Sequence, residues 1–153
     1  MRASIVAVGE RMPAWVAEGF AEYRKRLSRE LPLELVEVKS RGRDRDAAHA
    51  KDAEGEALLS AAREMHTVAL DGRGESWSSE ELARQLAKWR MGGRDVAFLI
   101  GGADGHAASV LKRANQRWSL GALTLPHILV RLIVAEQLYR AAMIVAGHPY
   151  HRG

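Results

Sequence analysis

The sequence has 153 residues, of which 47% are hydrophobic and 27% are charged, and it contains no cysteine. This length and composition predict one globular domain, 1–153, and exclude a disordered protein, a disulfide framework and thiol chemistry. The net charge of +4 mildly favours a polyanionic partner such as RNA or DNA.

Two strands and a helix are predicted at the start of the chain. The apolar run Ala3–Val8 predicts a strand, and the apolar periodicity from Trp15 to Leu27 predicts a helix, with Pro13 suited to its first turn. Leu33–Val38 alternates apolar and acidic residues, which is typical of a half-exposed or edge strand. The first apolar run is too short for a signal peptide, so we expect a soluble, cytoplasmic protein.

A charged segment, Lys39–Asp46, separates this strand from the next predicted helix. A solvated loop is its simpler interpretation, and phosphate binding by its arginines is the alternative. Ala47–Met65 is rich in helix-forming residues. Thr67–Leu70 predicts a short strand that stops at a turn formed by Asp71–Gly74.

The strongest strand prediction lies in the second half of the chain. Before it, Ser78 or Ser79 can cap a helix over Glu80–Met91. The strand Asp95–Ile100 then runs into Gly101–Gly105, a loop with three glycines.

The last third of the chain predicts a short helix, a short strand and a long helix. The short helix passes through Val110 and Leu111, the strand lies near Ser119–Leu123, and the loop Thr124–His127 leads to the long helix Ile128–Ala146. Charged residues within the long helix indicate a buried helix and no membrane span. Because strands and helices alternate, we expect an α/β fold with a mainly parallel sheet flanked by helices.

The chain ends in chemically active side chains, namely His148, Tyr150, His151 and Arg152. Chain ends usually carry little chemistry, so this tail is a candidate wall of a functional site. A solvated basic tail is an equally good interpretation of these residues alone. Their spacing matches no zinc pattern, so no metal is expected.

Three loops that follow predicted strands have the features of a ligand site. They begin after Leu70, Ile100 and Leu123, and ligands of parallel sheets bind beyond the carboxyl ends of strands. Glycines in the second loop let a flat ligand approach the backbone, although a tight turn alone would also account for them. The dinucleotide-binding, phosphate-cradling and serine-hydrolase motifs are absent, which argues against those three classes.

Five segments, spaced along nearly the whole chain, carry a resemblance to a known family. They are Val6–Gly9, Leu99–Gly105, Trp118–His127, Glu136–Ala141 and Tyr150–Arg152. Together they resemble the RlmH family over essentially the whole chain. Its members are small bacterial SPOUT-class methyltransferases that modify N3 of a pseudouridine in large-subunit (23S) ribosomal RNA.

The resemblance implies a fold, a cofactor and partners. The fold would be a SPOUT-type α/β sheet with a C-terminal trefoil knot, and the active form a homodimer. The partner would be ribosomal RNA within the assembled ribosome or large subunit, with no membrane involved. S-adenosylmethionine would bind in the knot, and the implied cofactor-binding residues are Leu70, Gly102, Gly121, Ala122, Leu123, Thr124, Leu125 and Pro126.

Methylation of a ring nitrogen defines what the catalytic residues must do. The nitrogen must lose a proton, and donor and acceptor must be held in line. The candidate catalytic residues are His127, Tyr150, His151 and Arg152, of which an imidazole suits the base and the guanidinium suits a negative oxygen. We expect the tail of one subunit to close over the cofactor of the other.

Two alternatives to this function stay open at the level of sequence. One is a non-catalytic ribosome-associated RNA-binding protein of the same basic α/β type. The other is a SPOUT methyltransferase acting on transfer RNA, although such enzymes often carry an added RNA-binding domain that 153 residues cannot accommodate.

Overall fold

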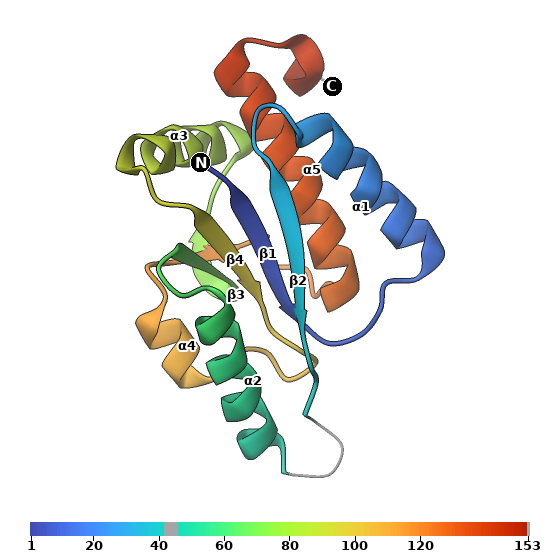
Figure 1. Ribbon diagram of the computed structural model, residues 1–153, viewed down its shortest axis with the longest axis vertical. Coiled ribbons are helices and arrows are strands. Elements are labelled where there is room, and N and C mark those ends of the chain that lie inside the picture. Colours follow the sequence, from blue (N-terminus) through green and yellow to red (C-terminus); the bar gives the residue numbers. More distant parts are fainter. Residues whose placement is uncertain (42–45, 153) are drawn as a thin grey trace.

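The structure is a computed structural model that describes residues 1–41 and 46–152, with side chains described as far as Tyr150. Over this range strands and helices alternate along the chain (Figure 1). The elements are β1 Ala3–Val8, α1 Ala14–Leu27, β2 Leu33–Val38, α2 Ala47–Ala61, β3 His66–Ser76, α3 Ser79–Gly92, β4 Val96–Ile100, α4 Ala108–Arg113, β5 Gln116–Ser119, α5 His127–Ala146 and the 3-10 helix η1 Pro149–Arg152.

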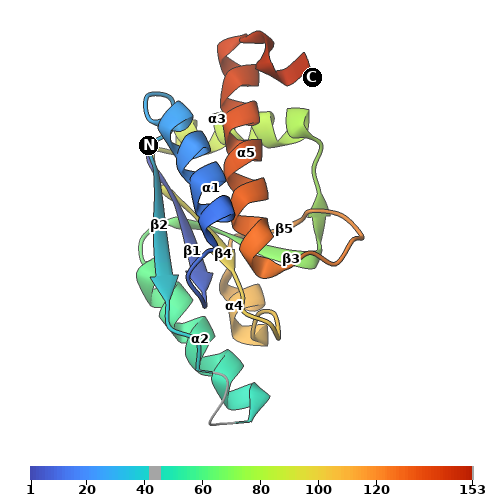
Figure 2. The same cartoon turned by 90° about the vertical axis from the view of Figure 1, so that its right-hand side faces the viewer.

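The five strands form one parallel sheet in the order β2-β1-β4-β3-β5. Helices α1, α3 and α5 pack on one face of the sheet, and α2 and α4 pack on the other (Figures 1 and 2). The predicted α/β fold with a parallel, helix-flanked sheet is therefore confirmed. The order of the strands does not test the trefoil knot, which stays a prediction.

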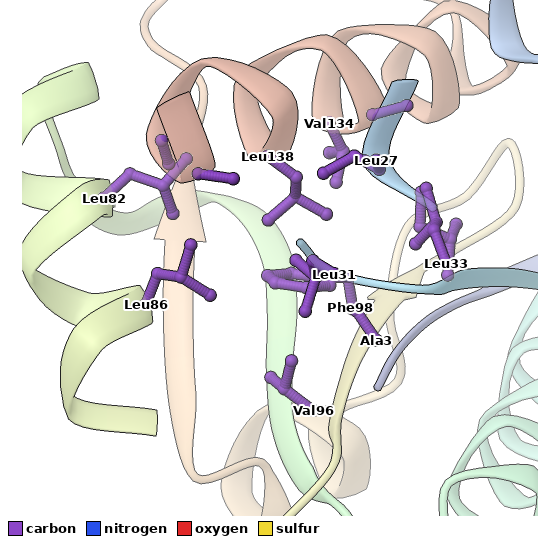
Figure 3. Packing of buried hydrophobic residues seen from close by; sticks show 14 of the residues in the cluster. Ala3, Leu27, Leu31, Leu33, Leu82, Leu86, Val96, Phe98, Val134 and Leu138 are labelled. Carbon is purple, nitrogen blue, oxygen red and sulfur yellow. The ribbon is translucent and has the colours of Figure 1, made fainter. Parts of the chain in front are cut away.

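The central strand β4 supplies side chains to both hydrophobic layers. Val96, Phe98 and Ile100 belong to the layer beneath α1, α3 and α5, whereas Ala97 and Leu99 belong to the layer beneath α2 and α4. This alternation follows from the two-residue period of a strand. Figure 3 shows the first layer, in which side chains of α3 and α5 meet those of β4. All five residues are buried, which accounts for the continuous apolar run in the sequence.

Strand β2 lies at one edge of the sheet, as its alternating pattern predicts. Its Glu37 reaches a wholly buried arginine of α5, and the distance from Arg131 Nη1 to Glu37 Oε2 is 2.6 Å. The Nε and Nη2 atoms of Arg131 have no partner among the described residues. This ion pair therefore links the edge strand to α5. It is the only polar contact that the described residues give the buried Arg131 guanidinium.

Both ends of α3 carry strong capping signals. Ser78 Oγ accepts a hydrogen bond from Glu81 N, and the Glu81 carboxylate accepts one from Ser78 N in return. This reciprocal capping box satisfies two backbone donors at the start of the helix. Gly93 ends the helix in the left-handed conformation, with φ of 74°. Of the two serines that the sequence offered as caps, Ser78 is the one used.

Strand β3 differs from its prediction. The predicted turn Asp71–Gly74 is part of the strand, which continues to Ser76 and pairs with β5 on both sides of an irregularity. A Cβ atom on Gly74 would lie 2.6 Å from the carbonyl carbon of Arg117. The glycine thus permits a close approach of two backbones, which local sequence does not distinguish from a turn.

Two further boundaries differ from their predictions. The helix predicted over Ala47–Met65 ends at Ala61, and Glu64 has a positive φ of 69°, which a helix cannot continue through. The strand predicted near Ser119–Leu123 ends at Ser119. The apolar residues after Ser119 leave the sheet and form a loop, so their hydrophobicity reflects a role other than strand pairing.

Helix α5 is the longest element and begins one residue before its predicted start. Its 20 residues correspond to a length of about 30 Å. Val134, Ala135 and Leu138 are buried against the sheet. No helix in the described parts of the chain has the length and apolarity that crossing a membrane requires.

The Arg131–Glu37 pair yields a prediction about stability. Glu37→Gln is expected to lower the free energy of unfolding by about 1–3 kcal/mol, because it leaves a buried guanidinium without its counter-charge. The loss is smaller than for a fully buried pair because 41% of the Glu37 side chain is exposed. Urea unfolding measures it. In an Arg131→Met background the same substitution should cost less, and an equal cost in both backgrounds would contradict the pairing.

Candidate functional site

A cavity of about 430 Å³ lies at the carboxyl edge of the sheet. Its walls come from the middle of β3 after Leu70, from the loop after β4 and from the loop between β5 and α5, which are the three places that the sequence singled out. Pro126 does not line it and instead caps α5. The other predicted cofactor-binding residues all line it: Leu70, Gly102, Gly121, Ala122, Leu123, Thr124 and Leu125.

The glycine loop after β4 folds tightly against itself. Gly105 N donates to the carbonyl oxygen of Gly102 over 3.0 Å, and a Cβ atom on Gly101 would lie 2.8 Å from the carbonyl carbon of Gly105. Gly105 has a φ of 78°, which L side chains rarely adopt. The loop is thus both a tight turn and a wall of the cavity, so the two interpretations of its glycines are compatible.

The loop between β5 and α5 is held by a side chain at its base. Gly121 N donates to Ser119 Oγ over 3.1 Å, and Gly121 has a φ of 116°. Beyond this turn, Leu123 lines the cavity and yet leaves 82% of its surface exposed. A large apolar side chain in that position favours contact with a ligand or with another protein surface.

His106 is a cavity residue that the sequence did not reveal. Its Nε2 atom lies 2.9 Å from the Leu99 carbonyl oxygen, which can only accept, so Nε2 carries the hydrogen. Burial lowers the pKa of His106, although the hydrogen bond to Leu99 partly opposes the shift. Nδ1 is buried without a partner among the described residues. In the sequence, the position of His106 directly after the glycine loop was the available signal.

His127 lines the same cavity from the first turn of α5. A Cβ atom on Gly9 would lie 3.5 Å from the Nε2 atom of His127, and Gly9 itself has a φ of 113°. The end of β1 therefore passes close to this imidazole. The ring of His127 makes no hydrogen bond with the described part of the chain, which leaves it available to a ligand.

Tyr150 belongs to η1, which follows the carboxyl end of α5, whereas the cavity adjoins the amino end of that helix at His127 (Figure 2). Its hydroxyl donates to Glu136 Oε2 over 3.0 Å and lies 3.4 Å from the hydroxyl of Tyr23. The Tyr139 and Tyr150 ring centroids are 4.5 Å apart, and the Arg140 guanidinium lies 4.9 Å from the Tyr150 centroid. These contacts fix the start of the tail to the end of α5.

Partial burial raises the pKa of Tyr150, and its hydrogen bonds to Tyr23 and Glu136 add to the shift. The phenol is therefore a protonated donor in this arrangement. Glu136 also accepts from Arg140, with 3.0 Å between Nη2 and Oε2, as an ion pair between residues four apart on one helix. The side chains of His151 and Arg152 lie outside the described part of the chain.

The predicted catalytic residues thus fall into two groups within one chain. His127 is at the cavity, whereas the Tyr150 hydroxyl is bonded to Glu136, nine residues or about 14 Å further along α5. The backbone of His151 and Arg152 continues from Tyr150 in η1. One copy of the chain does not bring the tail and the cavity together.

Comparisons with known proteins relate this arrangement to a family. A family model described as "Predicted SPOUT methyltransferase" matches residues 1–151. The sequence is also similar to the "Ribosomal RNA large subunit methyltransferase H" of Xanthomonas campestris pv. campestris. The two are 61% identical over 155 aligned residues, which cover 99% of each chain.

Solved structures with the same fold are far more distant in sequence. A probable methylase family protein from Haemophilus influenzae is 10% identical with a TM-score of 0.57, covering 97% of this chain and 69% of that one. A putative methyltransferase from Legionella pneumophila, solved with bound cofactor SAM, is 11% identical with a TM-score of 0.50, covering 93% and 66%. At these identities the likeness concerns the fold alone.

The buried imidazole of His106 yields a prediction about pH. Its folded-state pKa is below the ordinary 6.5, so the unfolded chain binds this proton more readily than the folded one. The contribution of this group to stability is fully present above pH 6.5 and is lost as pH falls through the lowered pKa. Urea unfolding across this range should show a weaker pH dependence in His106→Leu. Equal pH dependence in both proteins would contradict the assignment.

Proposed function

The chain belongs to the SPOUT methyltransferase family, and we propose that it transfers a methyl group from S-adenosylmethionine to N3 of a pseudouridine in large-subunit ribosomal RNA. The main support for this proposal is the 61% identity, over nearly the whole of both chains, to a relative named as a ribosomal RNA large subunit methyltransferase. The cavity formed by the three loops supports the same conclusion from the side of the structure. We further propose that the enzyme works in the cytoplasm on an assembled large subunit or ribosome.

The cavity fits S-adenosylmethionine in size and in the chemistry of its walls. Its volume of about 430 Å³ is in the range of small-molecule sites. Leu70 and Ile100 offer apolar surface to an adenine, and the bare backbone of Gly102 offers close approach to polar groups. Asp71 also lines the cavity, with 14% of its side chain exposed, so its carboxylate can pair with a cationic or hydroxyl group.

S-adenosylmethionine, when bound, supplies an electrophilic methyl group on a sulfonium sulfur. The residues of the chain then have two tasks, which are to align the acceptor nitrogen and to remove its proton. We assign proton acceptance to His127, because its imidazole lines the cavity without a protein partner. The proton would pass from N3 to the ring, and the nitrogen electron pair would form the bond to the methyl carbon as the carbon–sulfur bond breaks and its electron pair stays on sulfur.

The tail residues are assigned to the substrate side of the site. A guanidinium such as that of Arg152 would stabilise the negative oxygen that develops on the acceptor base. His151 is the second imidazole available to move a proton there. Tyr150 is assigned as a positioning residue, because its hydroxyl is already donated to Glu136 and its ring packs on Tyr139.

A homodimer follows from the separation of the cavity and the tail along α5. One chain bonds Tyr150 to Glu136, nine residues or about 14 Å along α5 from His127, so the tail would complete the site of another subunit. A groove next to the cavity supports a second subunit there, since Trp77, Leu125 and Ile133 give it an apolar lining. Leu123 lines both the groove and the cavity.

Cofactor binding tests the enzyme against a non-catalytic RNA-binding protein. Gly101→Ala is expected to weaken S-adenosylmethionine binding at least about tenfold, because its Cβ atom would meet the Gly105 backbone at 2.8 Å and displace the loop. Gly92→Ala is the matched control, since a Cβ atom there meets nothing within 4 Å. Calorimetric titration measures both. No saturable binding by the unaltered protein would favour the non-catalytic alternative.

Subunit mixing tests the role of the tail. Deletion of residues 150–153 is expected to abolish methylation of ribosomal RNA and to leave cofactor binding measurable. A mixed dimer of this variant with Gly101→Ala should regain activity, because one site then combines an intact cavity with an intact tail. Tritium transfer from labelled S-adenosylmethionine measures it. A mixture that stays inactive despite forming mixed dimers would show that the tail acts within its own chain.

A further inference from the structure

A second cavity, of about 350 Å³, lies at the amino end of the sheet beneath the last turns of α3. His66 is the first residue of β3, four positions before Leu70 of the cofactor cavity, which corresponds to about 13 Å along the strand. The two cavities therefore open at opposite ends of the sheet. The side chains that line the second one are His66, Gln85, Lys88, Trp89, Arg94 and Gln116.

The hydrogen bonds in this cavity have only one consistent direction. Trp89 Nε1 can only donate, and it donates to Gln116 Oε1 over 2.8 Å, which fixes the orientation of that amide. His66 Nε2 lies 2.7 Å from the same oxygen and must therefore carry a hydrogen. Gln116 Nε2 then donates to Gln85 Oε1 over 3.0 Å.

In this network one hydrogen-bond acceptor and one donor remain without a partner among the described residues. In the tautomer with the hydrogen on Nε2, His66 Nδ1 is the remaining acceptor, and the Nε2 amide of Gln85 keeps its hydrogens. Neither atom has a protein partner in the described parts of the chain. An unused acceptor and donor in one cavity match the polar edge of an unpaired nucleobase. The partly exposed His66 ring, which packs on the buried Trp89 ring with centroids 5.9 Å apart, adds aromatic surface for base stacking.

The charges around the cavity favour a phosphate. Lys88 and Arg94 line it, and no carboxylate does so among the described residues. The Arg94 Nη2 and Nε atoms are engaged by the carbonyl oxygens of Met65 and Glu64, at 2.8 and 3.4 Å, which fixes the guanidinium in place. Its Nη1 atom and the Lys88 ammonium stay available to an anion, and both donate strongly to phosphate oxygens.

We propose that this cavity binds a nucleotide of the substrate RNA that is unpaired and lies outside the reaction centre. The inference rests on the proposed function, because that function makes RNA the nucleotide-bearing partner. The base would bond to His66 Nδ1 and Gln85 Nε2, and its phosphate would meet Lys88 and Arg94. A second contact of this kind would let the protein bind RNA at a distance from the methyl-accepting base.

The proposal is tested with a labelled single-stranded RNA oligonucleotide and, separately, with adenosine 5′-monophosphate as probes. Lys88→Ala and the near-isosteric Gln85→Glu are each expected to weaken RNA binding about fivefold to tenfold. Lys88→Ala should also reduce the slope of log affinity against log salt by about 0.7, the value for one phosphate contact on a single strand. Arg84→Ala is the matched control, since this α3 cation lies outside the cavity lining and is 66% exposed.

S-adenosylmethionine titration accompanies each variant, and its affinity should not change. Cofactor binding and RNA binding are measured separately. An absence of methylation by the unaltered protein would therefore refute the proposed function, whereas the RNA affinities of the variants decide this inference. RNA affinity that is unchanged in both Lys88→Ala and Gln85→Glu would overturn the proposal. Equal affinity for the monophosphate and the oligonucleotide would overturn the assignment to RNA in favour of a free nucleotide.

Ultraviolet crosslinking gives a readout that does not depend on any variant folding. The oligonucleotide bound to the unaltered protein is expected to crosslink within the α3 segment that contains Lys88 and Trp89. Mass spectrometry of the digested complex identifies the attached peptide. Crosslinks confined to the cofactor loops would overturn the proposal.

Discussion

The parallel pairing of β4 with β1 and β3 is the constraint on which the site depends. Parallel strands direct their carboxyl ends to the same edge, so segments distant in sequence must meet there. Leu70 at the end of the first segment of β3 and Gly101 after β4 become neighbours in one cavity for this reason. Strand β5 adds the third loop through its own parallel pairing with β3. The cavity is thus a consequence of sheet topology as much as of local sequence.

The second constraint is the rigidity of α5. A continuous helix with a buried face cannot bend to bring its two ends together, and the contacts of Tyr150 with Glu136 and Tyr139 fix the tail to α5 away from His127. This separation gives the expected homodimer a physical reason, because within one chain only His127 of the proposed catalytic residues lies at the cavity. The same helix begins at His127, so a single element sets the position of the proposed base and of the tail.

The loops that line the cavity could be located from the sequence because their signals are local. Glycines after a strongly apolar strand, and a proline before a helix, can be recognised without tertiary information. His106 was missed because its place after the glycine loop was the only local signal, and sequence alone does not show that its imidazole is buried. The extension of β3 through Gly74 was also not predicted, because in sequence a glycine that permits close backbone packing cannot be told from a turn residue.

The class of fold, most of the element order and the three loops of the cavity could be predicted from the sequence, and family resemblance added the chemistry. Each of these depends on periodicity or on motifs that a linear chain displays directly. The separation of His127 from Tyr150, the burial of Arg131 against Glu37 and the directed network around Gln116 emerge only from the folded chain. The hydrogen bonds from Trp89 to Gln116 and from Arg131 to Glu37 join residues 27 and 94 positions apart. Their physical cause is the packing of helices on a parallel sheet, which no local pattern encodes.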